Sequence, residues 1–472
     1  MTKIVELRLD DLPDGSFRVT LEIKSNLKSL SRATGNLPSA DRVIELYRQW
    51  RSIYCSLGYI DRDGKDLAKY SRDSNSESLN RAIVPKKIVY GGSIETSIQE
   101  CDRLSKKLGA ELSRWLLSRD PGGDFLDIEK QLRQNLKSEE EISFLICTPS
   151  QEIRRLPWHL WDLLDRYTRA EVSLSTIEFS APPKTIYRAK FVRILAILGN
   201  SRGIDIDRDK EQLENLPHTD ITFLVEPDKE KLQDYLQNRS WDILFFAGHS
   251  KTEGERGSID LNLHDRIDLK DLRSALKTAV EQGLQLAIFN SCDGLGLAKE
   301  LEELHIPQTI VMREPVPDRV AQAFLTYFLP LFASGVSLSS AVRAAREQLT
   351  ALEDRYPCAS WLPIICQNPA VEPLTWQELR DTSAKKSFWD SLPLTLAGSA
   401  IIALLLKLWK LKANEVESGL DEIPSNLTNV SGTLFFTADD GIHGRELWKS
   451  DGTPSATTIV ADHYPGRNSS FL

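Results

Sequence analysis

The 472-residue sequence predicts an α/β protein whose main domain is a mostly parallel sheet covered by helices on both faces. Two observations support this fold class. Short apolar runs rich in Ile, Leu and Phe recur through the second half of the chain, as expected for strands buried on both faces. Helical segments separate these runs, and a strand–helix–strand order is typical of a parallel sheet.

The beginning of the chain is predicted to be a smaller α+β region. Residues 4–9 and 17–23 alternate apolar and polar side chains around a turn, which predicts a β-hairpin. The segment 156–161 is rich in Trp and Leu and favours a core helix in which His159 packs with its hydrogen-bonding groups satisfied. The other elements of this half are predicted as helices at 40–56, 93–117 and 125–136 and a strand at 142–147.

From residue 191 the alternation of strands and helices becomes regular. A short hairpin within residues 254–267 is expected to overhang the end of one strand. Strands are predicted at 191–198, 221–225, 242–247, 284–290, 309–312 and 362–366, and helices at 210–216, 229–237, 269–281, 297–304, 319–333 and 338–352.

Charge and cysteine content exclude several function classes. The net charge of −9 disfavours general binding of nucleic acid. The six cysteines form no Cys-x-x-Cys pair and no zinc-binding spacing, so no metal or cofactor is predicted. Such cysteines are typical of free thiols in a reducing cytoplasm, where the main domain is expected to work.

Two reactive side chains follow consecutive predicted strands. His249 follows the strand at 242–247 by two residues, and Cys292 follows the strand at 284–290 by two residues. Neighbouring strands lie about 4.8 Å apart, so the two side chains are expected to meet at the carboxyl edge of the sheet. There an imidazole can deprotonate the thiol, and a following helix start favours the thiolate. The alternative is a hydrogen-bonded loop histidine and a cysteine that packs as a small apolar side chain.

Three segments resemble the motifs of CHAT domains, relatives of caspases and separase: residues 156–164, Phe246-Ala247-Gly248-His249-Ser250 and Phe289-Asn290-Ser291-Cys292-Asp293-Gly294. The resemblance covers roughly residues 89–369 and implies a caspase-like three-layer sandwich. It also implies a bacterial cysteine endopeptidase for signalling or defence, with Cys292 as nucleophile and His249 as general base and acid. The backbone N–H groups of Ser250 and Cys292 would form the oxyanion hole, although caspases carry Gly where this chain has Ser250.

The resemblance also bears on specificity. Asp318 lies in a region that lines the primary specificity pocket of relatives, and Asp293 is a second candidate for the pocket wall. Their alternatives are a helix N-cap for Asp318 and a charge at a helix start for Asp293. The expected partners are a protein or peptide substrate and an activating protein. A non-catalytic interaction module of the same fold is the alternative function.

The C-terminal part has a different composition. The uncharged run 391–406, flanked by Trp and Lys, predicts one transmembrane helix at 389–410 that anchors the protein to a membrane, with an interfacial or buried helix as the alternative. Residues 446–453 resemble a single Glu-Leu-Trp-x-Ser-Asp-Gly-Thr repeat, so a small β tail is predicted. The expected divisions are an N-terminal region at 1–85, the CHAT domain at 86–370, linkers at 371–388 and 411–428 around the transmembrane helix at 389–410, and the tail at 429–472.

Overall fold

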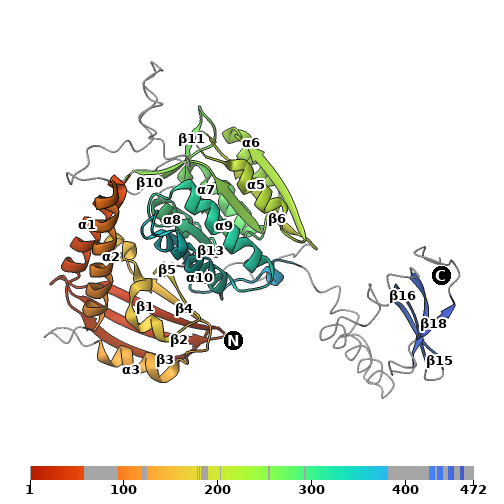
Figure 1. Ribbon diagram of the computed structural model, residues 1–472, viewed down its shortest axis with the longest axis horizontal. Helices are drawn as coiled ribbons and strands as arrows, with labels where there is room; N and C mark the ends of the chain where they lie inside the picture. The colour runs from red at the N-terminus through yellow and green to blue at the C-terminus, as the bar shows by residue number, and fades with distance from the viewer. Residues whose placement is uncertain are drawn as a thin grey trace. The chain divides into compact units, whose positions relative to one another are not determined.

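The computed structural model describes residues 2–57, 94–117, 125–177, 179, 181, 190–201, 204–253, 256–291, 294–380, 425–430, 433–439, 445–450 and 458–461. The chain forms two compact units, Met1–Thr382 and Ser383–Leu472, each of which is described by itself (Figure 1).

The first unit is built on a single 11-stranded sheet. Its strands are β1 (Lys3–Asp11), β2 (Phe17–Ser25), β3 (Lys28–Leu37), β4 (Ile142–Cys147), β5 (Ala170–Ser175), β6 (Val192–Leu198), β7 (Thr219–Val225), β8 (Ile243–Ala247), β12 (Leu286–Asn290), β13 (Gln308–Met312) and β14 (Pro363–Gln367). They lie in the order β3-β2-β1-β4-β5-β14-β13-β12-β8-β6-β7. The antiparallel pairs are β1–β2, β2–β3 and β13–β14, and the other neighbours are parallel. The prediction of a mixed α/β fold with a large, mostly parallel sheet is therefore confirmed.

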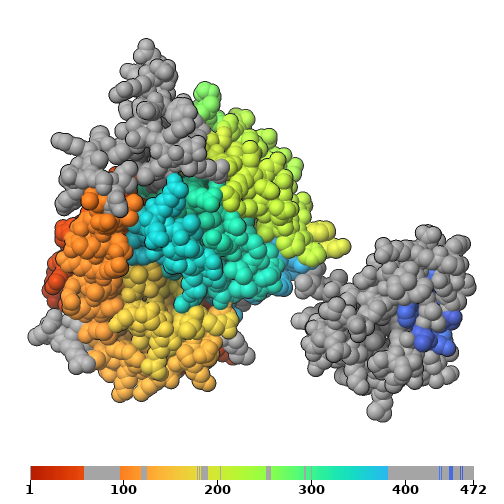
Figure 2. All heavy atoms as spheres, in the orientation of Figure 1, coloured from red at the N-terminus to blue at the C-terminus, as the bar shows by residue number. Residues whose placement is uncertain are grey.

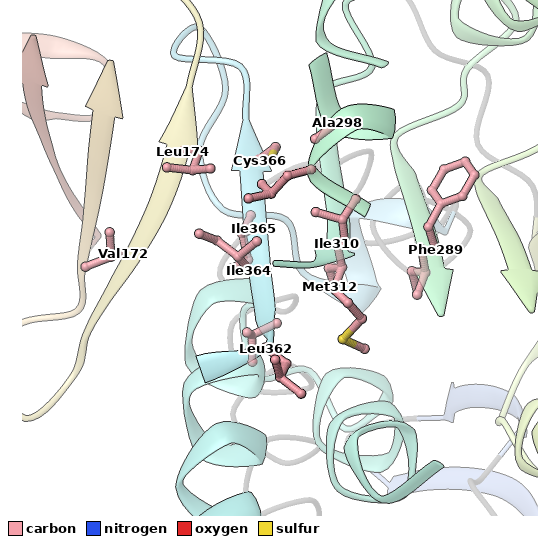
Figure 3. Packing of buried hydrophobic residues seen from close by; sticks show 14 of the residues in the cluster. Val172, Leu174, Phe289, Ala298, Ile310, Met312, Leu362, Ile364, Ile365 and Cys366 are labelled. Carbon is pink, nitrogen blue, oxygen red and sulfur yellow. The ribbon is translucent and has the colours of Figure 1, made fainter. Parts of the chain in front are cut away.

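Strand β14 joins the two halves of this sheet. It pairs antiparallel with β13 and parallel with β5. Figure 3 shows Ile365 and Cys366 of β14 between Leu174 of β5 and Ile310 of β13, and all four side chains are buried. Because β1 also pairs with β4, the N-terminal hairpin is part of the main sheet. The boundary expected at residue 85 falls outside the described residues.

Helices cover both faces of the C-terminal half of the sheet. The helices are α1 (Asp41–Ser56), α2 (Ile94–Leu116), α3 (Leu126–Asn135), α4 (Gln151–Arg155), α5 (Ile206–Glu214), α6 (Lys229–Asn238), α7 (Arg273–Glu281), α8 (Gly294–Glu303), α9 (Asp318–Ala333) and α10 (Leu338–Leu349). Helix α5 leads from β6 outward to β7, whereas α6, α7 and α8 each lead in the opposite direction across the sheet. Since parallel crossovers are right-handed, α5 covers one face and α6, α7 and α8 cover the other.

Packing agrees with this assignment of layers. Helix α5 packs against α9 and α9 against α10, while α6 packs against α7. In the space-filling view the yellow-green and the teal residues lie side by side on one face of the first unit (Figure 2). In the N-terminal half, α1 packs on α2 and α3 packs on β3.

The Trp-rich segment after α4 is not the α-helix that its sequence predicts. It forms two 3₁₀ turns, η2 (Trp158–Leu160) and η3 (Asp162–Arg166), separated by Trp161 in an extended conformation. Pro157 precedes the first turn and cannot donate a backbone hydrogen bond. The expected core role is confirmed for Trp158 and Trp161, which are each 1% exposed. The expectation of a satisfied His159 is wrong, because its buried Nε2 has no hydrogen-bond partner in the described part of the chain.

Residues 371–380, predicted to begin a linker, pack into the first unit instead. The 3₁₀ turn η7 (Trp376–Leu379) buries both of its terminal side chains, and the Trp376 ring meets Phe332 edge-on at 5.5 Å between centroids. Three further 3₁₀ turns of this unit are η4 (Leu269–Leu272), η5 (Thr350–Leu352) and η6 (Ala359–Trp361).

The second unit contains a small β-sheet, as the tail sequence predicts. Four antiparallel strands, β15 (Ser425–Val430), β16 (Thr433–Asp439), β17 (Arg445–Ser450) and β18 (Thr458–Ala461), pair in chain order. The predicted transmembrane segment 389–410 lies outside the described residues. Among the helices that the structure does describe, none has the length and apolar character needed to cross a membrane.

Candidate active site

The predicted neighbours β8 and β12 do pair in parallel, with Ala247 opposite Asn290. His249 follows Ala247 by two residues, and Cys292 follows Asn290 by two residues. The two chain segments therefore leave the sheet at its carboxyl edge from the same level. Cys292 and Asp293 lie outside the described residues. His249 and Ser250 are described, and both are half-buried.

The backbone around His249 is held on both sides. A side chain at Gly248 would approach the Phe246 ring to 2.9 Å, so only glycine fits between the strand end and His249. The His249 carbonyl accepts a hydrogen bond from the Asp260 N–H at 2.9 Å. Asp260 ends the second strand of a three-stranded sheet made of β9 (Ser250–Glu253), β10 (Arg256–Asp260) and β11 (Arg266–Asp268). This sheet contains the predicted hairpin and extends it by a strand.

The helix that follows Cys292 is fixed just as closely. Helix α8 begins at Gly294, where an added Cβ would lie 2.7 Å from the Val311 Cβ and 3.0 Å from the Met312 nitrogen. The start of α8 thus packs directly on β13. The hairpin after His249 covers the same helix, because a Cβ at Gly257 would lie 2.7 Å from the Leu297 side chain. The chain segments that follow the two candidate residues are therefore packed against each other.

An acidic cluster lies beside the end of β12. Asp209 of α5 is 1% exposed, and its carboxyl group hydrogen bonds with the Asn290 side chain. Burial, and next the negative charge of Asp318, raise the pKa of Asp209 to about 7, while Asn290 opposes this rise. The Asp318 carboxylate accepts a hydrogen bond from the Gln322 amide at 2.9 Å. Asp318 is thus close to the carboxyl edge that carries Asn290.

Asp318 was predicted either to line the specificity pocket or to be the N-cap of a helix, and the structure tests the second role. The cap residue of α9 is Pro317, and Asp318 is the first residue of the helix, so it is not the N-cap. Its half-buried carboxylate still lies in the first helical turn, where the helix dipole favours a negative charge. Asp293, the other pocket candidate, is outside the described residues.

Sequence reasoning missed Asp209 and Asn290. Helix α5 reads as a charged surface helix, and only the spacing of Asp209 with Leu213 and Leu216, four and seven residues on, indicates that it shares their buried face. Within the described part of the chain, three buried oxygens here have no hydrogen-bond partner: Asp209 Oδ1, Asn290 Oδ1 and Ser291 Oγ. Such atoms are rare in folded proteins and are available to a bound ligand. No group of three or more His, Cys, Asp or Glu among the described residues is arranged to hold a metal ion.

Comparisons with known proteins identify the family. No curated protein sequence matches the chain. One similar solved structure is the Saccharomyces cerevisiae separase–securin complex, with 11% identity and a TM-score of 0.45 over 77% of this chain, which spans only 30% of that one. Another is the Arg-specific cysteine proteinase gingipain R, with 10% identity and a TM-score of 0.35 over 53% of this chain and 68% of that one. The family model of the CHAT domain matches residues 103–376, more than half of the 472 residues, and the protein therefore belongs to the CHAT domain family.

Proposed function

We propose that the protein is a caspase-like cysteine endopeptidase in which Cys292 is the nucleophile and His249 the general base and acid. The observation that carries the proposal is the register of the two central strands. Ala247 lies opposite Asn290, and the histidine and the cysteine each follow at the same offset of two residues. Membership of the CHAT family supports the same assignment.

The proposed reaction has two halves. His249 takes the proton of the Cys292 thiol, and the thiolate attacks the carbonyl carbon of the scissile peptide bond. The backbone N–H groups of Ser250 and Cys292 stabilise the oxyanion, and the C–N bond breaks as His249 returns the proton to the leaving amine. A water molecule, deprotonated by His249, then hydrolyses the thioester and regenerates the thiol.

The acidic cluster supports a preference for substrates with a basic residue before the scissile bond. Asp318 and Asp293 are the pocket residues proposed from the sequence, and Asp209 adds a buried carboxyl group behind Asp318. A Lys or Arg side chain would supply the donors that the free Asp209 and Asn290 oxygens lack. Asp318→Ala is expected to reduce this preference.

Removing either dyad residue tests the proposed chemistry. A diverse peptide library is incubated with wild-type protein, Cys292→Ala and His249→Ala, and cleavage is followed by mass spectrometry. Each change should lower turnover by roughly 10³-fold or more, because each removes a group that reacts in the chemical step. Cys55→Ala, which removes a half-buried thiol in α1, is the matched control and should retain activity.

Equal cleavage by wild-type and Cys292→Ala protein would sink the peptidase assignment. Retained binding of a protein partner by Cys292→Ala, without cleavage by the wild type, would instead indicate a non-catalytic interaction module of the same fold.

We further propose that the catalytic part acts in the cytoplasm in bacterial signalling or defence, under control of an activating protein, and is anchored by residues 389–410. The apolar run with its Trp and Lys flanks supports the anchor.

A further inference from the structure

A buried carboxylate lies in the turn that connects β13 to α9. Glu314 is fully buried and belongs to residues 313–317, which lead directly to Asp318. Its carboxylate accepts a hydrogen bond from the Tyr47 hydroxyl at 2.5 Å and from Arg51 Nε at 2.7 Å. Arg155 Nη1 donates a third at 3.2 Å. Two of the three donors come from α1, a helix far from this turn in sequence.

Helix α1 holds the same turn at a second point. The Tyr54 hydroxyl donates to the Pro315 carbonyl at 2.6 Å. Tyr47, Arg51 and Tyr54 follow one another at spacings of four and three residues, so they lie on one face of α1. Trp50 stacks on the Tyr54 ring at 5.1 Å and meets the Trp361 ring at 5.0 Å, which fixes this face against the domain.

The turn is also fixed at its beginning. The Arg313 N–H donates to the Leu362 carbonyl at 2.6 Å, and Arg313 Nη1 donates to the Leu156 carbonyl at 2.7 Å. Beyond the turn, the Pro317 carbonyl accepts from the N–H groups of Val320 and Ala321 at 2.9 and 3.0 Å, which starts α9. A displacement of the turn would therefore be passed on to Asp318.

The turn leaves the sheet where the site lies. Strand β13 runs parallel to β12, so residues 313–317 emerge at the same carboxyl edge as His249. A buried carboxylate with two arginines gives little net stability, because desolvation offsets the attraction between the charges. Such a group is better suited to fixing one geometry of the chain than to adding stability.

Resting on the proposed function, we propose that Glu314 is a positioning residue for the peptidase site. Clamped by Tyr47 and Arg51 of α1, it holds the turn that sets the place of Asp318 in the acidic cluster with Asp209. Helix α1, which precedes the matched CHAT segment, is thereby part of the substrate-binding apparatus.

Tyr→Phe changes test the clamp with the least disturbance. Tyr47→Phe and Tyr54→Phe each remove one hydroxyl and keep the ring that packs on Trp50. The matched control is Tyr167→Phe, which removes a buried hydroxyl that donates to the Leu132 carbonyl at 3.4 Å in another part of the first unit. Glu314→Gln is a stronger variant, but it leaves two arginines without their buried counter-charge and is useful only if it folds.

Two readouts are made on the full-length protein. Hydrogen exchange is measured by mass spectrometry on peptides covering residues 316–322. The kcat and KM values are measured for a peptide with Arg before the scissile bond and for the same peptide with Leu there. In Tyr47→Phe and Tyr54→Phe, exchange of the 316–322 amides should rise about tenfold, and KM for the Arg peptide should rise several-fold with kcat little changed. Tyr167→Phe should change neither.

A purely structural role predicts a different result. Exchange would then accelerate equally in all strongly protected peptides, or not at all, and the preference for Arg would be kept; either outcome overturns the proposal. Faster local exchange with unchanged KM also overturns the positioning role. If wild-type protein shows no cleavage that depends on Cys292, the proposed function fails, and the exchange data separately decide whether α1 holds the turn.

Discussion

At the scale of single residues, Asp209 is a buried side chain whose charge state changes near neutral pH. Its carboxyl group is buried beside the Asp318 carboxylate, and the resulting rise brings the pKa of Asp209 from 3.8 to about 7. In the unfolded chain the group ionises near its usual value. The folded state therefore binds one more proton than the unfolded state between about pH 4 and the folded pKa.

The titration of Asp209 makes the stability of the fold depend on pH. A raised carboxyl pKa contributes stability that is present below the unfolded pKa and is lost as pH rises through about 7. Asp209→Asn keeps a group that can hydrogen bond with Asn290 but cannot ionise. The free energy of unfolding of both proteins is measured with denaturant at pH 5 and pH 8. Because only wild type loses stability on ionisation, the free energy of unfolding of the variant relative to wild type should be higher at pH 8 than at pH 5 by up to a few kcal/mol, at about 1.4 kcal/mol per pKa unit. A difference between the two proteins that stays constant over this range would contradict the assignment.

The sequence predicts some site residues far better than others, for a physical reason. His249 and Cys292 follow apolar strands, and apolar strands are recognisable without a structure. Asp209 and Glu314 are acidic residues whose buried carboxyl groups bind partners distant in sequence, namely Asn290 for Asp209 and Tyr47 with Arg51 for Glu314. No local pattern contains those contacts, so neither residue could be assigned a role from the sequence.

At the scale of elements, the contact between strand β10 and helix α8 couples the segments that follow His249 and Cys292. A Cβ at Gly257 would lie 2.9 Å from the Leu297 Cα and 3.0 Å from its nitrogen, so backbone would have to move. Gly257→Ala should therefore lower the free energy of unfolding by roughly 1–3 kcal/mol, the usual cost of overpacking. Denaturant unfolding measures this change directly.

The same substitution in helix α2 serves as the control. A Cβ at Gly109 would lie 3.4 Å from the Leu160 Cδ1, an ordinary contact, and the residue is inside a helix. Gly109→Ala should raise the stability by up to about 1 kcal/mol, because alanine is the better helix former. A Gly257→Ala protein as stable as wild type would mean that α8 and β10 are not in tight contact.

Two strands that were not predicted from the sequence, β3 and β5, contain many polar residues. Strand β5 is buried at every position although it contains Glu171, Ser173 and Ser175. Glu171 pairs with Arg346 at 2.5 Å, and the Ser175 hydroxyl donates to the Gln367 carbonyl at 2.7 Å. Strand β3 is an edge strand with mostly exposed side chains, so its sequence lacks a clear apolar face. The apolar strands β6, β8, β12 and β13 were predicted to within two residues.

At the scale of the whole molecule, the family match covers less than the first compact unit. Residues 103–376 lack β1, β2 and β3, which extend the sheet beyond β4, and they lack α1, which supplies Tyr47 and Arg51 to Glu314. They also lack Leu379, which is fully buried. The smallest self-contained body is therefore the unit that ends at Thr382, and shorter pieces would expose a strand edge and a buried carboxylate.

Because the first unit ends at Thr382, a chain that ends there can be compared with the full-length protein to test the membrane anchor. The full-length protein should sediment with membranes and resist alkaline carbonate, because the uncharged run 391–406 with flanking Trp and Lys favours insertion. A chain ending at Thr382 keeps Trp376 and Leu379 in its core and should stay in the supernatant. Ile401→Lys places a charge near the middle of the run at a cost of about 2.5–3.5 kcal/mol and should release the full-length protein. An interfacial helix would be extracted by carbonate from wild-type membranes, and this result would contradict a transmembrane helix. Full-length protein that does not sediment with membranes would also contradict it.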